Sequence, residues 1–126
     1  MRTNAGRDYM ARVIGDTAST GTGSYAPACW IGLTANATAP AATDTVLTGE
    51  IASGTLLRAQ ATYAHTNGTA SYTLTKTFTS DQTVTLAKIG IFNGSSANTL
   101  VFATLLSATA GLVSGDQIQV TDTVTL

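Results

Sequence analysis

Threonine recurs at every second position in several stretches of this chain, and this period constrains the fold more than any other feature. The runs are Thr73 to Thr79, Thr83 to Thr85, and Thr121 to Thr125. A period of two places alternate side chains on opposite faces of a β-strand, and β-branched Thr suits an exposed pleated surface. Because the 25 threonines outnumber the 13 charged residues, the outward faces are expected to carry hydroxyl groups and few charges.

Turn signals separate the expected strands at short intervals. Asn67-Gly68 favours a two-residue hairpin turn, and further turns are expected at 80–82, 93–98 and 111–116. Short strands at this spacing are typical of β-sandwiches and barrels. A chain of 126 residues is long enough to bury one core. The sequence therefore predicts a single mainly β domain over residues 1–126, an antiparallel β-sandwich of jelly-roll or immunoglobulin-like type with one short N-terminal helix.

The N-terminal residues 1–15 carry a helical pattern. A helix is predicted over 4–15, where Thr3 or Asn4 can cap its first turn and apolar residues recur at helical spacing. These apolar residues are Met10, Val13 and Ile14. Residues 16–27 are rich in Thr, Ser, Gly and Ala, so a flexible arm or loop is expected there.

Basic residues are concentrated at the N-terminus, where three of the six in the chain lie. They form either a solvated helix face or a docking element for an acidic neighbour. The candidate interface residues are Arg2, Arg7 and Arg12 and, in the arm, Tyr25.

Two charges interrupt the apolar, inward-facing positions of the expected strands. Even-numbered residues of 72–78 and 118–126 are otherwise mostly apolar, but they include Lys76 and Asp122. An unpaired charge in a core is costly. We therefore expect either an ion pair between these two residues or an opening of both strands to solvent or a subunit interface. The parity also changes within 83–92, which predicts a β-bulge near Ala87-Lys88.

Residues suited to catalysis or metal binding are scarce. His65 is the only histidine and is expected on the surface, and Cys29 is the only cysteine and is expected to be buried. The chain has no Cys/His metal motif and no G-x-S-x-G elbow. We expect no enzymatic activity, no cofactor and no metal. An enzyme would require His65 to converge with Asp44 or Glu50.

The charge balance and hydropathy also bear on partners. The net charge is -1 and the pI about 5.5, whereas a nucleic-acid-binding domain shows a basic face. No segment approaches the roughly 18 apolar residues of a membrane span, and the N-terminus lacks the apolar run of a secretory signal. We expect a chain made in the cytoplasm, with neither nucleic acid nor membrane as partner. Its hydroxyl-rich surface is easier to bury than a charged one, which favours a subunit of an assembly.

A series of short motifs extends along nearly the whole chain. They are residues 4–9, 30–34, 44–51, Arg58, 88–92, 99–102 and 115–120. In this order of motifs the sequence resembles short structural proteins of tailed-bacteriophage virions. The resemblance implies a β-sandwich that coats or joins other virion proteins as head decoration, neck or collar, or tail accessory. The shared motifs are interpreted as fold determinants: Gly32 and Gly90 allow close packing, and Glu50 bonds to Arg58 across a loop.

The leading hypothesis is a non-catalytic capsid decoration subunit, located in the virion and made in the host bacterial cytoplasm. It would contact major capsid, neck or tail proteins as a homo-oligomer, a trimer or another cyclic ring, which would also cover exposed strand edges. A neck, collar or tail accessory protein is the first alternative. A receptor- or glycan-binding tip is the second, with Trp30, Tyr63 or Tyr72 stacking on a sugar, although a core position is the favoured interpretation of these aromatic residues.

Overall fold

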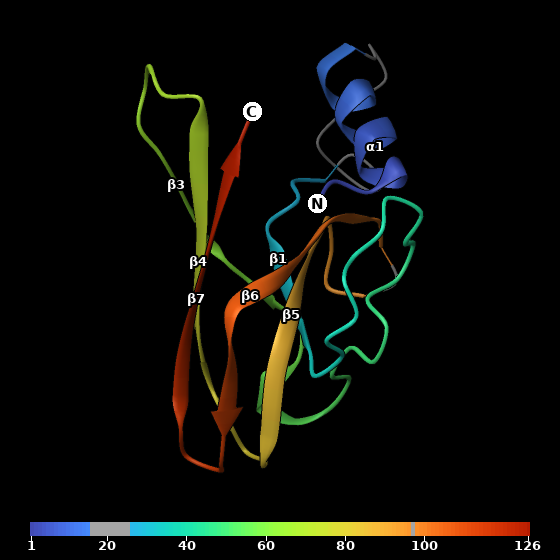
Figure 1. The fold of residues 1–126 in the computed structure, drawn as a ribbon. Helices are drawn as coiled ribbons and strands as arrows, with labels where there is room; N and C mark the ends of the chain where they lie inside the picture. The colour runs from blue at the N-terminus through green and yellow to red at the C-terminus, as the bar shows by residue number, and fades with distance from the viewer. Residues whose placement is uncertain (16–25, 97) are drawn as a thin grey trace.

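The structure is a computed structural model that describes residues 1–15, 26–96 and 98–126, except for the side chain of Arg12. Seven strands form two antiparallel sheets, of order β2-β1-β5-β6 and β3-β4-β7, which pack as a β-sandwich with one N-terminal helix beside it (Figure 1). The elements are α1 (Asn4–Gly15), β1 (Trp30–Thr34), the 3-10 turn η2 (Gly54–Leu56), β2 (Ala59–Gln60), β3 (Thr62–His65), β4 (Ser71–Thr79), β5 (Val84–Phe92), β6 (Leu100–Leu112) and β7 (Gln117–Thr125).

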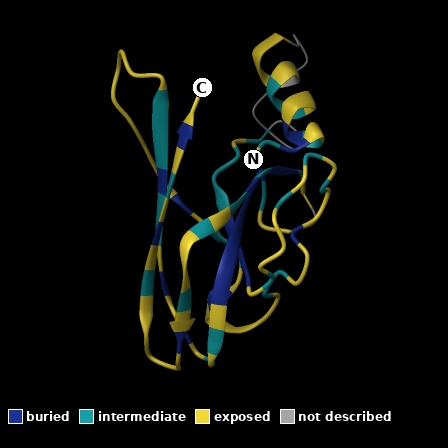
Figure 2. Cartoon of the chain, viewed as in Figure 1, coloured by how far each residue is buried: buried dark blue, intermediate teal, exposed yellow. Residues whose placement is uncertain are grey.

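The period-two pattern is confirmed in the β3-β4-β7 sheet. β4 and β7 pair over nine residues without a register shift, from Ser71 opposite Thr125 to Thr79 opposite Gln117. Along both strands the buried side chains are even-numbered, and the odd-numbered positions carry mostly exposed Thr and Gln. Figure 2 shows this alternation as a change of colour along the two ribbons. Apolar contact with the facing sheet therefore determines the orientation of both strands.

β5 is the centre of the second sheet and is buried on both faces. Every residue from Leu86 to Phe92 is buried, because the loop after β1 covers the face turned away from the sandwich. Lys88 shows this cover directly: its Nζ donates a hydrogen bond to the Thr38 carbonyl at 3.0 Å. The ladder between β5 and β6 shifts register between Leu86 and Lys88, so the predicted β-bulge is confirmed.

The strand expected before the Asn67-Gly68 turn is divided between the two sheets. β2 pairs with β1, and after Ala61 the chain continues as β3, which pairs with β4. The turn itself is as predicted, with Gly68 at a φ of +85° and the Thr69 N–H donating to the Thr66 carbonyl at 3.1 Å. Because β2 and β3 follow one another closely, one short segment supplies an outer strand to each sheet.

α1 begins at Asn4 and ends at Gly15, as predicted. Thr3 caps it, since its Oγ1 accepts a hydrogen bond from the Gly6 N–H at 2.9 Å. Gly6 permits close packing on β6, because a Cβ there would lie 2.2 Å from the Val101 carbonyl oxygen. The expected apolar stripe does not pack fully: α1 projects past the sheets (Figure 1), leaving Ile14 84% exposed. The described helix is not long and apolar enough to cross a membrane.

Candidate functional site

The two ends of the sandwich are connected differently. At one end the β4–β5 and β6–β7 connections both run from one sheet to the other. At the other end the β3–β4 and β5–β6 connections each stay within a sheet, and there the β3–β4 hairpin and α1 stand on opposite sides (Figure 1). We call these the closed end and the open end. The β2–β3 connection at Ala61 also passes between the sheets and lines the open end. No hairpin of the described chain joins the sheets there, so their inner faces are less completely covered than at the closed end.

A cavity of about 550 Å³ lies at the open end, between α1 and the β3-β4-β7 sheet. Its lining is mainly apolar and includes three of the four tyrosines of the chain. We call it the tyrosine cleft and define it by Tyr9, Met10, Cys29, Tyr63, Tyr72 and Phe102. A partly apolar cavity with a few hydroxyl groups is a favourable binding surface, because aromatic side chains offer large contact area and a polar edge.

Tyr63 is the most accessible aromatic group of the tyrosine cleft. It stands opposite Leu74 in the β3–β4 ladder, yet its side chain is 60% exposed whereas Leu74 is buried. The ring centroid of Tyr63 is 5.5 Å from that of Tyr72 and 6.5 Å from that of His65. The core interpretation of Tyr63 is therefore wrong. β3 is an outer strand at the open end, where too little of the other sheet covers this ring.

The other two tyrosines are held more firmly. The Tyr9 hydroxyl donates to the Ala26 carbonyl at 2.5 Å, which ties α1 to the segment before β1. Partial burial raises the pKa of Tyr9 above its usual value. It also raises the pKa of Tyr72, with the nearby Asp122 charge acting in the same direction. Both phenols therefore stay neutral at physiological pH.

Lys76 and Asp122 lie on the inner face, as expected, but they do not form an ion pair. Their register positions are diagonal neighbours, since Leu74 stands opposite Asp122 and Lys76 opposite Val120. The described residues contain one ion pair, and it joins other side chains. Both residues are half-buried, and Asp122 lines a groove that opens to the surface. Burial raises the pKa of Asp122, and the N-terminal ammonium group acts in the opposite direction.

The candidate basic interface is only partly described. Arg7 is exposed on α1, whereas Arg2 is half-buried and its backbone forms a bridge with Phe102 on β6. The side chain of Arg12 and the whole of Tyr25 lie outside the described residues. The same holds for most of the arm expected at 16–27, of which Ala26 and Pro27 are described. Of the predicted interface, Arg7 thus offers a free basic side chain.

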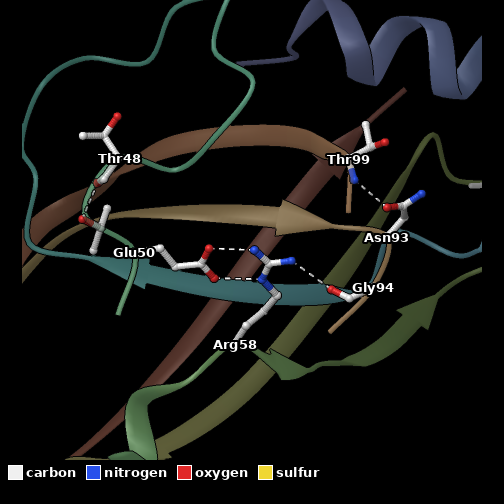
Figure 3. A network of polar contacts seen from close by, with 7 residues as sticks. Thr48, Glu50, Arg58, Asn93, Gly94 and Thr99 are labelled. Atoms are coloured by element: carbon white, nitrogen blue, oxygen red, sulfur yellow. Dashed lines mark hydrogen bonds and ion pairs between the residues drawn. The ribbon is translucent and has the colours of Figure 1, made fainter. Parts of the chain in front are cut away.

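On the outer face of the β2-β1-β5-β6 sheet, polar contacts join the segments that contain Glu50, Arg58 and Gly94 (Figure 3). We call this group of three residues the polar bracket. Arg58 donates two hydrogen bonds to the Glu50 carboxylate, at 2.6 and 2.8 Å, and a third to the Gly94 carbonyl at 3.2 Å. Its guanidinium carbon lies 3.4 Å from the centroid of the Phe92 ring. The expected bond between Glu50 and Arg58 is confirmed.

Paired glycines make room for this bracket. Gly32 and Gly90 stand opposite each other in the β1–β5 ladder. A Cβ on Gly32 would lie 2.6 Å from Glu50 Oε2, and a Cβ on Gly90 would lie 2.9 Å from Leu100 Cδ1. The expectation that these glycines allow close packing is confirmed. The contacts of Arg58 therefore hold the segments around Glu50 and Gly94 together beside β1 and β5.

The residues considered for catalysis each have another structural role. His65 is exposed, with Nδ1 2.9 Å from the Ser71 carbonyl oxygen. Glu50 is paired with Arg58, and Asp44 accepts a hydrogen bond from the Ala41 N–H at 2.9 Å. Within the described ranges, no three His, Cys, Asp or Glu side chains are grouped so as to hold a metal ion.

The tyrosine cleft is the feature of the structure that sequence reasoning did not find. Cys29, expected to be buried, is half-buried and lines it. Trp30 is also half-buried, packed against Phe92 and its neighbours in the smaller apolar cluster. The available signal was the pair Tyr63 and Tyr72, which flank the Asn67-Gly68 hairpin and so had to lie near each other.

Comparison of the chain with models of known protein families and with curated proteins found no match.

Proposed function

We propose that this protein is a non-catalytic structural subunit of a tailed-bacteriophage virion, a capsid decoration protein that binds a larger protein lattice through its open end. The observation that carries the proposal is the tyrosine cleft, an apolar cavity of about 550 Å³ at one end of an otherwise hydroxyl-covered sandwich. The resemblance of the sequence to short virion proteins supplies the biological setting.

The surface beside the tyrosine cleft supports a protein partner. Val13 and Ile14 on α1 are 41% and 84% exposed, and Tyr63 on β3 lines the cleft together with Tyr9 and Met10 of α1. Exposed apolar groups gathered in one region mark interaction surfaces, and tyrosine is enriched among residues that dominate binding energy. Few charges need to be desolvated when such a surface is covered.

A neck, collar or tail accessory position would use the same open end and remains the alternative within the virion. A glycan-binding tip is the second candidate function, and the accessible ring of Tyr63 beside His65 favours it. Aromatic rings of this kind can stack on a sugar face. A glycan screen with the isolated chain distinguishes this candidate from lattice binding.

The test is addition of the purified chain to virion particles that lack it. Tyr63→Ser is expected to weaken binding by about 10- to 30-fold, the effect of losing one aromatic anchor. Val113→Ser is the matched control, because Val113 is similarly exposed, at 53%, but lies at the closed end between β6 and β7. Equal weakening by the two variants, or wild-type chain that does not bind particles, would contradict the proposal. Saturable glycan binding lost in Tyr63→Ser would favour the tip instead.

A further inference from the structure

The sandwich has four outer strands, and three of them are protected against pairing with another chain. β2 has two residues and β3 has four, so each offers only a short edge. β6 is long, but its ladder with β5 is irregular at two places. The N-terminal segment also covers its first part, with the Thr3 N–H donating to the Val101 carbonyl at 3.1 Å and the Ala103 N–H to the Met1 carbonyl at 2.9 Å. Such devices prevent edge-to-edge association.

β7 is long and regular, and no described segment hydrogen-bonds to its outer edge, although Met1 and Arg2 lie beside its second half. It has nine residues, pairs with β4 without a bulge, and contains no Pro, Lys or Arg. One inward-facing charge, Asp122, is its only feature that opposes edge pairing.

The hydrogen-bonding parity shows which backbone groups of β7 face outward. At the two ends of the β4–β7 ladder, the Leu126 N–H donates to the Ala70 carbonyl and the Ser80 N–H to the Asp116 carbonyl, both at 2.7 Å. In an antiparallel ladder the hydrogen-bonded pairs alternate with non-bonded pairs. Even-numbered residues of β7 therefore bond to β4, and odd-numbered ones point to the free edge. The outward N–H and C=O groups of 117–125 have no hydrogen-bond partner within the described part of the chain.

We propose that β7 pairs antiparallel with β7 of a second copy of this chain, so that the β3-β4-β7 sheet continues across a two-fold axis. The edge is self-complementary, since its outward-facing backbone donors and acceptors match those of an inverted copy. The side chains that accompany them on the outer face are the hydroxyls and amides of Gln117, Gln119, Thr121 and Thr123. No like charges meet on that face.

Asp122 determines the register of this pairing. With the axis at residue 122 the two carboxylates would stand directly opposite each other, and with the axis at Thr121 they would be only about 8 Å apart. With the axis at Val120 they are about 14 Å apart, and Gln119 of each copy faces Thr121 of the other. We assign the last register, in which the inward charge restricts the alignment without preventing association.

The surface beside β7 gives the pairing additional area. A groove of about 370 Å³ runs between β6 and β7, and its mixed lining includes Leu105, Ile118, Thr121 and Asp122. Leu105 on β6 is 42% exposed. β6 and β7 are the outer strands of the two sheets at the same edge of the sandwich. A second copy that pairs with β7 therefore also covers this groove. The inference does not depend on the virion role, because it concerns two copies of the isolated chain.

Disulfide trapping tests the pairing of β7 with β7 of a second copy. In a Cys29→Ser background, Gln119→Cys with Thr121→Cys places each new thiol opposite one from the other copy, at a Cα separation of about 5.5 Å that suits a disulfide. Thr77→Cys with Thr75→Cys is the matched control, because these residues stand beside Gln119 and Thr121 in the ladder but on β4, one strand from the edge. We expect at least tenfold more covalent dimer from the β7 pair on mild oxidation. Equal yields from the two pairs would overturn the proposal.

Sedimentation of the unmodified chain tests the stoichiometry. The wild type is expected at twice 12.8 kDa. Thr121→Pro, which removes an outward N–H that β4 does not use, is expected to sediment as a folded monomer. Thr121→Lys keeps that N–H and places a charge on the edge, so it should also be monomeric. This variant keeps the test valid if the proline variant fails to fold. A wild-type monomer, an assembly with an odd number of chains, or a Thr121→Lys variant that stays fully dimeric would each contradict β7 pairing. Binding of the monomeric variants to particles then tests the virion role separately.

Discussion

The closed and open ends of the sandwich are built from the same strands but differ in what covers their inner faces. Toward the closed end, Phe78, Leu86 and Leu112 meet between the sheets in one buried cluster. At the open end, Tyr63, Tyr72 and α1 border a cavity. The core thus extends to the cavity, where Leu74 of the main cluster lies beside the exposed ring of Tyr63. A β-sandwich can keep part of its inner face for binding when one end is fastened and the other is left uncovered.

The largest expected effect is in the closed end. Phe78 is 2% exposed and belongs to the main core cluster, so Phe78→Ala is expected to destabilise the protein by about 3–5 kcal/mol through lost contacts and a residual cavity. Chemical denaturation measures this value. Tyr63→Ala is the comparison at the open end and should cost less than about 1 kcal/mol, since a mostly exposed side chain loses little burial. Similar costs would mean that the two ends contribute equally.

The next largest loss of stability is expected from substitutions in the polar bracket. Glu50→Gln leaves the Arg58 guanidinium half-buried without its carboxylate, which is expected to cost about 2–3 kcal/mol. Arg58→Met and the double variant complete a double-mutant cycle in urea unfolding. A double variant as destabilised as the sum of the two single variants would show that the pair is not coupled.

A pH-dependent effect is expected at Asp122. Folding raises the pKa of this carboxyl by burying it, so its favourable contribution is complete below the ordinary value of 3.8 and is lost as pH rises through the raised value. Asp122→Asn should therefore raise the melting temperature at neutral pH. The advantage should disappear below pH 3.8, as a series of thermal melts will show. An Asn variant that is less stable than the wild type at pH 7 would indicate a favourable partner for the carboxylate.

The smallest expected effect on stability comes from surface substitutions. Tyr63→Ser and Val113→Ser are each expected to change the free energy of unfolding by about 0.5 kcal/mol or less. The two differ in particle binding, where Tyr63→Ser alone should weaken association. Parallel denaturation and binding measurements separate the functional role from folding. A loss of stability in Tyr63→Ser large enough to explain its weaker binding would remove this distinction.

Local periodicity was sufficient to predict most of the fold. The threonine alternation identified β4 and β7, and the parity change near Lys88 identified the bulge. The division between β2 and β3 was not predicted, because a change of sheet after Ala61 depends on long-range pairing and leaves no local signal. The exposure of Ile14 was missed for a similar reason: helical spacing defines an apolar face but not whether a sheet lies beneath it.

The candidate site was less accessible to sequence reasoning. The tyrosine cleft combines α1, the segment before β1, and the β3–β4 hairpin, which are far apart in the sequence. Inward parity also does not report that Lys76 and Asp122 are diagonal neighbours and that both stay partly exposed without forming an ion pair.

The central claim is that the open end is the surface that contacts the lattice. Imaging of the particle that contains this protein tests it most directly, because the orientation of the sandwich is visible in the density. The account predicts that α1 and the β3–β4 hairpin face the lattice, with Tyr63 buried in the contact and the β6–β7 turn pointing away. A subunit attached through the β6–β7 turn, with Tyr63 and α1 facing solvent, would contradict it.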